Sequence, residues 1–116
     1  MTNATATELQ RETGLYDMKN LDKIRMLGVH APETMAAFVA FDRAALAEGA
    51  ISRKYKELMA LAVALTTQCP YCIELHSSKA RELGGSEREM AETVLVAAAL
   101  RAGAAVTHGT HAMKGV

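Results

Sequence analysis

Aromatic residues are scarce in this chain of 116 residues, and tryptophan is missing altogether. Aromatic residues make up 4% of the sequence, although half of all residues are hydrophobic. A core must therefore be built from alanine, leucine, valine and methionine. Alanine side chains are too small to fill space between widely separated elements, so this composition favours closely packed helices.

An excess of charge of either sign is also absent. The 13 basic and 13 acidic side chains give a formal net charge of zero, so nothing points to nucleic acid or to an anionic membrane. The longest apolar stretches are interrupted by a charge within about a dozen residues, whereas a membrane-spanning helix needs about 20. Residues 1–11 are polar and lack the apolar centre of a signal peptide. We therefore expect a soluble, cytoplasmic protein that binds neither nucleic acid nor membrane.

Helix patterns follow one another along most of the chain, and no stretch alternates with a period of two. Capping residues and N-terminal prolines mark where helices begin. Beyond a short turn over 9–17, we expect a helix over 20–27 capped by Asn20, a helix from Pro32 to Gly49, and a helix over 53–67 capped by Ser52.

The second half of the chain has equally clear boundaries. A helix begins at Pro70 and ends near Leu83, before Gly84 and Gly85. Ser86 and Glu89 form a capping box for the next helix, which we expect to break or bend at Gly103 before a last segment over 104–114. The sequence thus predicts one all-α domain over residues 1–116, of about five to six helices. Residues 1–19 are expected to form a loose N-terminal arm.

The only two cysteines lie in the run Cys69-Pro70-Tyr71-Cys72, and His76 follows four residues later. In a reducing compartment a cysteine pair of this spacing is more often redox-active or metal-binding than structural. Cys69 would cap the helix and Cys72 would lie in its first turn, where free N–H groups favour a thiolate. His76 shares a helix face with Cys72 and could take its proton. One thiol would attack a peroxide or a disulfide, and the other would close a disulfide.

Glu57 lies twelve residues before Cys69, about 18 Å along an unbroken helix, so the two are not neighbours on one helix. If the chain reverses near Gln68 into an antiparallel hairpin, Glu57 faces a position one turn from His76. We therefore expect a contact between Glu57 and His76, direct or through water, in a relay of Glu57, His76 and a cysteine. The alternative is that Glu57 is a solvated residue of an exposed helix face.

The run Glu57, Cys69, Cys72 and His76, with these spacings and in a helical chain, resembles the active-site motif of the alkylhydroperoxidase D-like proteins of the carboxymuconolactone decarboxylase superfamily. The flanking segments 52–63 and 80–84 are similar to that family as well. The resemblance implies an all-helical fold with a central helical hairpin that carries the two cysteines. It also implies a trimer or a hexamer.

The same resemblance implies a thiol-dependent peroxidase that reduces alkyl hydroperoxides, or a disulfide reductase, in antioxidant defence. Cys72 matches the peroxidatic thiol, Cys69 the resolving thiol, and His76 and Glu57 the proton relay. Tyr71 stands where the best-known peroxidases of the family have histidine, and we expect it either to line the pocket or to pack over the site or an interface. Such an enzyme needs no cofactor or metal, but it needs a peroxide substrate and an external dithiol reductant.

Two other function classes stay open. Cys69, Cys72 and His76 would bind zinc if Glu57, His108 or His111 supplied a fourth ligand. Alternatively, the protein is a non-catalytic scaffold or binding protein in which both cysteines are small core residues. In either case, alanine-rich apolar helices in so short a chain would leave large patches exposed, so we expect a homo-oligomer.

Overall fold

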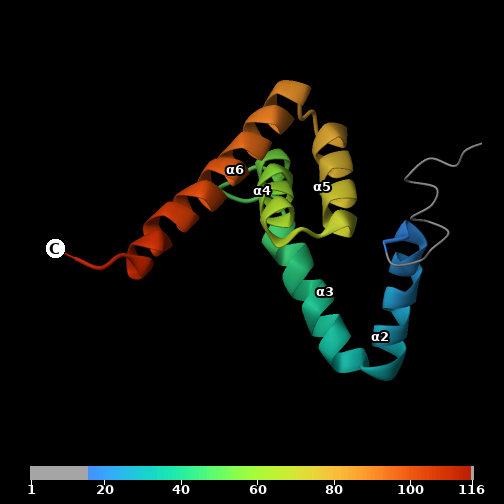
Figure 1. The fold of residues 1–116 in the computed structure, drawn as a ribbon. Coiled ribbons are helices and arrows are strands. Elements are labelled where there is room, and N and C mark those ends of the chain that lie inside the picture. Colours follow the sequence, from blue (N-terminus) through green and yellow to red (C-terminus); the bar gives the residue numbers. More distant parts are fainter. Residues whose placement is uncertain (1–15, 116) are drawn as a thin grey trace, which may run out of the picture. The chain divides into compact units, whose positions relative to one another are not determined.

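A computed structural model describes residues 16–115, and these residues are helical apart from short connections (Figure 1). Five α-helices and two short 3₁₀ helices account for this part of the chain, which contains no strand: η1 (Met18–Lys23), α2 (Ile24–His30), α3 (Pro32–Leu46), α4 (Arg53–Thr67), α5 (Pro70–Glu82), α6 (Glu87–Gly109) and η2 (Thr110–Ala112). The predicted all-α fold is confirmed. The described residues group into two compact units, 16–47 and 48–115.

The first unit is built from η1, α2 and α3. Asp17, and not Asn20, caps its first helix, because the Asp17 side chain accepts a hydrogen bond of 2.9 Å from the backbone N–H of Lys19. Pro32 occupies the first turn of α3, as predicted, and α3 ends at Leu46, three residues before the expected Gly49. The helical turn expected over 9–17 and most of the expected arm over 1–19 lie outside the described residues.

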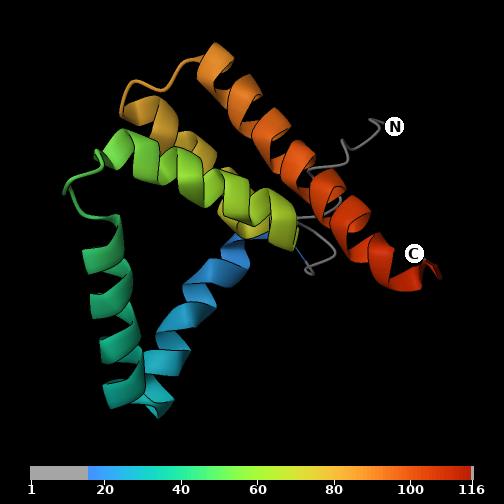
Figure 2. The ribbon, with the colours of Figure 1, turned by 90° about the vertical axis from the view of Figure 1, so that its left-hand side faces the viewer.

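The second unit is organised around α4, which packs against both α5 and α6 (Figures 1 and 2). The Ser52 side chain caps α4 and accepts a hydrogen bond from the backbone N–H of Tyr55. One cluster of side chains from the three helices forms the core: Leu58, Leu61, Ala80 and Met90 are buried, and Leu65 and Ile73 pack against them. Alanine and mid-sized aliphatic residues therefore build the core, as the composition predicts.

The connection from α5 to α6 is fixed by two glycines and a capping box. Gly84 has a positive φ of 92°, and a Cβ at Gly85 would lie only 2.8 Å from the Ala80 carbonyl oxygen. Larger residues at these positions would strain the turn. Ser86 and Glu89 then form the predicted capping box, in which each side chain accepts a hydrogen bond from the backbone N–H of the other residue.

Helix α6 differs from the prediction in its length. It continues through Gly103 to Gly109 without a break, because a glycine within a helix costs only about 1 kcal/mol relative to alanine. Arg101 is the only Asp, Glu, Lys or Arg between Glu92 and Lys114. By length and composition, the segment Glu87–Ala112 would suffice to cross a membrane, and only 11% of its most apolar stretch is buried. This corrects the expectation that no run is long enough.

Candidate functional site

The two cysteines lie at the point where the chain turns from α4 into α5. Gln68 ends α4 in the left-handed conformation, with φ 57° and ψ 48°. The backbone N–H of Cys69 then donates a hydrogen bond of 3.1 Å to the Ala64 carbonyl oxygen. Cys69 is the N-cap of α5, Pro70 is its first residue, and Cys72 follows in the first turn. The predicted helical hairpin that carries the cysteine pair is therefore confirmed.

Glu57 and His76 form a buried pair that joins α4 to α5. The Nδ1 atom of His76 lies 2.6 Å from Oε2 of Glu57, and Glu57 is only 3% exposed. An ionised carboxylate only accepts hydrogen bonds, so the Nδ1–H group of His76 donates a hydrogen bond to Glu57, and in the neutral ring the other nitrogen, Nε2, is the acceptor. The predicted contact is confirmed, and the alternative of a solvated Glu57 is wrong.

Glu57 is buried because of its position on α4. It lies one turn before Leu61 and two turns before Ala64, and all three belong to the helix face that is buried in this unit. A charged carboxylate on such a face is costly unless it is hydrogen-bonded. His76 meets that requirement and keeps 20% of its own side chain exposed, so the pair connects a buried charge to the surface.

Both cysteines are in the thiol form and half-buried. Interaction with the backbone N–H of Cys72 lowers the pKa of the Cys69 thiol most, and the Cys72 side chain and the backbone N–H of Tyr71 lower it further, while burial opposes them. Although Cys69 makes no regular N-cap hydrogen bond, it stands where the free donors of α5 favour an anion. The lowered pKa is that of Cys69, and the thiolate expected at Cys72 stays a prediction.

The remaining candidate residues are placed as follows. Tyr71 is half-buried beside the cysteines. His108 and His111 have ring centroids 6.2 Å apart, both are exposed, and Nδ1 of His108 lies 3.1 Å from the Ala104 carbonyl oxygen. Across residues 16–115, no three His, Cys, Asp or Glu side chains gather in a way that could hold a metal ion. The zinc alternative therefore lacks a preformed set of ligands in this part of the chain.

Arg101 of α6 reaches the end of α4, and it is not among the residues predicted from the sequence. Its Nη1 atom lies 3.5 Å and 3.4 Å from the carbonyl oxygens of Leu65 and Thr66, which precede Cys69 by four and three residues. The signal that could have found it is its isolation, because no other Asp, Glu, Lys or Arg lies in the long stretch between Glu92 and Lys114.

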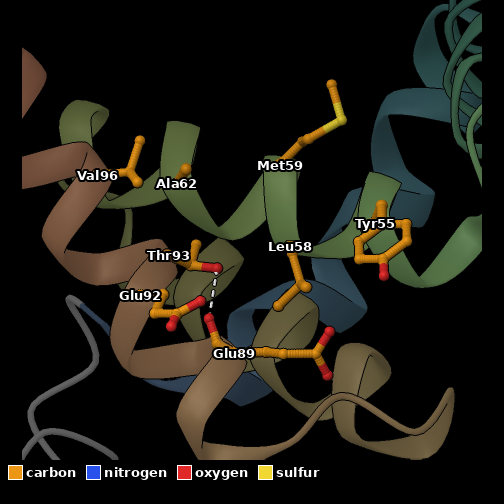
Figure 3. A pocket seen from close by; sticks show the side chains of 8 residues that line it. All are labelled: Tyr55, Leu58, Met59, Ala62, Glu89, Glu92, Thr93 and Val96. Atoms are coloured by element: carbon orange, nitrogen blue, oxygen red, sulfur yellow. Dashed lines mark hydrogen bonds between the residues drawn. The ribbon is translucent and has the colours of Figure 1, made fainter.

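A cavity of about 330 Å³ lies between α4 and α6 (Figure 3). Its lining is mostly apolar, with two carboxylates from α6: Tyr55, Leu58, Met59, Ala62, Glu89, Glu92, Thr93 and Val96. Lys54 of α4 pairs with Glu89 at 3.0 Å. None of the lining residues belongs to the thiol site, so this cavity is a separate feature on another side of α4.

Comparison with known proteins shows the family to which this chain belongs. The model of the carboxymuconolactone decarboxylase family matches residues 32–115, which is most of the chain. The chain belongs to this family. Membership confirms the resemblance to the alkylhydroperoxidase D-like proteins of the same superfamily, together with the helical fold that the resemblance implied. It leaves the reaction open, because a family with this fold is defined by its scaffold and not by one substrate.

The chain is also similar to individual proteins. The chain is 44% identical over 77 residues to an uncharacterized protein of the cox locus of Paracoccus denitrificans, covering 66% of this chain and 69% of the relative. It is 41% identical over 88 residues to an uncharacterized protein of Haemophilus influenzae, covering 76% and 78%. A crystal structure of an apo carboxymuconolactone decarboxylase family protein from Legionella pneumophila is similar at 30% identity, with a TM-score of 0.68 over 78% of this chain and 80% of that one.

Proposed function

We propose that this member of the carboxymuconolactone decarboxylase family is a dithiol oxidoreductase that reduces hydroperoxides, with Cys69 and Cys72 as its redox pair. The observation that carries the proposal is the buried Glu57–His76 pair. A carboxylate that is 3% exposed and bonded to an imidazole at 2.6 Å is a costly feature in a core this small. It is the arrangement that fixes an imidazole as a proton acceptor beside a nucleophile.

The first step is attack by the Cys72 thiolate on the terminal oxygen of the hydroperoxide. His76 lies four residues after Cys72 and so on the same face of α5. Its Nε2 atom accepts the thiol proton and returns it to the departing alkoxide, while Glu57 stabilises the charged ring. The O–O bond breaks, an alcohol leaves, and Cys72 is oxidised to a sulfenic acid.

The second step uses Cys69. Its thiolate, favoured by the backbone N–H groups of Cys72 and Tyr71, attacks the Cys72 sulfur and expels hydroxide, which takes a proton from the solvent to become water, and the disulfide closes. An external dithiol then attacks Cys72, and Cys69 leaves. A thiol with a lowered pKa is the better leaving group, so the same electrostatics assist both resolution and reduction. Because this last step is thiol exchange, the site would also reduce disulfides.

An assembly of identical chains is part of the proposal. Helix α6 leaves several large aliphatic side chains in solvent, among them Leu95 and Leu100, each 66% exposed, and Val106, 74% exposed. Exposed apolar residues along one helix are typical of an interface with another chain. We expect a homo-oligomer, a trimer or hexamer as the family resemblance implies, working in the cytoplasm, where dithiol reductants are available.

The test of the proposed reaction is the intact mass and the free-thiol content of the reduced protein after one equivalent of an alkyl hydroperoxide. We expect both thiols to disappear together, with a mass loss of two hydrogens and release of one equivalent of alcohol. The matched control is the Cys69→Ser, Cys72→Ser double variant, which should leave the peroxide intact. Two thiols that persist after hours of exposure would refute the proposal and favour a non-catalytic scaffold. Zinc that copurifies with the protein would favour a metal site.

A further inference from the structure

The end of helix α4 is held by a charged side chain from α6. The carbonyl groups in the last turn of a helix have no partner within that helix. In α4, two of these carbonyls, those of Leu65 and Thr66, face the guanidinium group of Arg101 at 3.5 Å and 3.4 Å. A cation at a helix C-terminus also complements the helix dipole. Arg101 thus caps α4 across a sequence separation of 35 residues or more.

The backbone that follows this cap sets the position of the thiols. Gln68 is the only residue other than glycine with a positive φ among the described residues. A left-handed conformation is unfavourable for glutamine and persists only where the surroundings hold it. Here the N–H groups of Gln68 and Cys69 both donate to the carbonyl oxygen of Ala64. The position of Cys69 therefore depends on an intact last turn of α4.

We propose that Arg101 is a positioning residue for the dithiol. By capping the last turn of α4, it keeps Gln68 in its left-handed conformation and holds Cys69 at the N-cap of α5, beside Cys72. A thiol that is already held beside its partner loses less conformational freedom when the disulfide closes, so the cap raises the effective concentration of one thiol at the other. The proposal rests on the redox role assigned above to Cys69 and Cys72.

The isolation of Arg101 on α6 supports a specific role. A charged side chain within a long apolar helix face lowers the apolar area that a partner chain can cover. Arginine at this position therefore weakens such an interface unless its charge makes a favourable contact elsewhere. Arg88, in the first turns of the same helix, provides the contrast. Its side chain is 90% exposed and pairs with Glu92 of the same helix at 3.6 Å, so this ion pair joins α6 to no other element.

The experiment compares Arg101→Gln with the matched control Arg88→Gln in the full chain. The first measurement is the dithiol–disulfide equilibrium constant of Cys69 and Cys72 in glutathione buffers. In Arg101→Gln we expect disulfide formation to become less favourable by about fivefold, the factor that one hydrogen bond of ordinary strength supplies. In Arg88→Gln we expect a change below about twofold, because exposed ion pairs contribute little. Arg101→Lys, which keeps the charge, should recover part of the loss.

The second measurement is hydrogen exchange at the backbone N–H groups of Gln68 and Cys69 in the reduced protein. Arg101→Gln should accelerate this exchange severalfold, and Arg88→Gln should leave it unchanged. If Arg101→Gln matches Arg88→Gln in both measurements, Arg101 does not position the thiols. If the wild-type protein forms no disulfide in any buffer, the proposed redox function is wrong, and the exchange measurement alone then decides whether Arg101 fixes the turn.

Discussion

Two sides of helix α4 show opposite relations between polarity and burial. On the side of α5, a carboxylate and an imidazole are joined at 2.6 Å and Glu57 is almost fully buried. On the side of α6, the cavity is mostly apolar, and the long aliphatic side chains beyond it are exposed. A soluble protein usually has the reverse arrangement, with charges outside and aliphatic residues inside. This contrast is the basis for proposing chemistry on the first side and a protein partner on the second.

The largest effect is expected from replacing the cysteines on the α5 side. Cys72→Ser should abolish peroxide turnover, because it removes the thiol assigned to attack the peroxide, and Cys69 alone has no second thiol with which to close a disulfide. Cys69→Ser should still react once and stop at a sulfenic acid, which a dimedone reagent traps and mass spectrometry detects. Both variants should keep the wild-type fold, since each replaces a half-buried sulfur by a similar hydroxyl group. Equal trapping in the two variants would contradict the assigned roles.

The next effect concerns the buried carboxylate. Glu57→Gln retains an acceptor for the Nδ1 proton of His76 but removes the charge that stabilises a protonated ring. We expect the second-order rate constant for peroxide reduction to fall about 10²-fold, the lower end of what a positioned acid–base group contributes. The matched control is Glu74→Gln, an exposed glutamate on the same hairpin, which should react like the wild type. A Glu57→Gln variant with full activity would reduce the Glu57–His76 pair to a structural contact.

The proposed interface on the α6 side is tested by placing a charge on the exposed aliphatic face of this helix. Leu100→Glu should dissociate the proposed oligomer, because a carboxylate buried at an apolar interface without a partner loses its hydration. Sedimentation velocity at micromolar concentration should show a smaller species than for the wild type. Ser78→Glu, at an exposed position of α5, is the control and should leave assembly unchanged. A wild-type protein that already sediments as a monomer would remove the proposed explanation for the exposed face.

Most structural features of the α5 side could be predicted from the sequence, but few of those of the α6 side could. Cap residues, Pro70 and the glycine pair set the helix ends, and the hairpin geometry placed Glu57 within one turn of His76, because these features depend on local chemistry and simple spacing. Gly103 misled the prediction, since a glycine is a weak helix breaker and α6 tolerates it. The contact of Arg101 with the end of α4 depends on how two helices pack, and no local pattern encodes that.

The smallest effect, and the one that best separates the two sides, is a pH dependence. On the α6 side, the backbone N–H of Ser86 lowers the pKa of Glu89 most, and Lys54 lowers it further. Glu89 in turn raises the pKa of Lys54. Both groups therefore stay charged between about pH 6 and pH 9, given ordinary pKa values near 4.3 and 10.4. Lys54 and Glu89 therefore add no pH dependence in this range. A pH-dependent difference in stability between the wild type and a Cys69 variant then arises on the α5 side.

For Cys69 the sign follows from its lowered pKa. The folded protein then holds fewer protons than the unfolded chain at pH values between the two pKa values, so the thiolate contributes stability that is complete above the unfolded pKa, about 8.5. That contribution is lost as the pH falls through the folded pKa. The free energy of unfolding of the reduced wild type, minus that of Cys69→Ser, should therefore increase as the pH rises through this window. Urea titrations at several pH values measure this difference in the free energy of unfolding. A difference that stays constant or decreases as the pH rises would mean that the N-terminus of α5 does not favour the Cys69 thiolate.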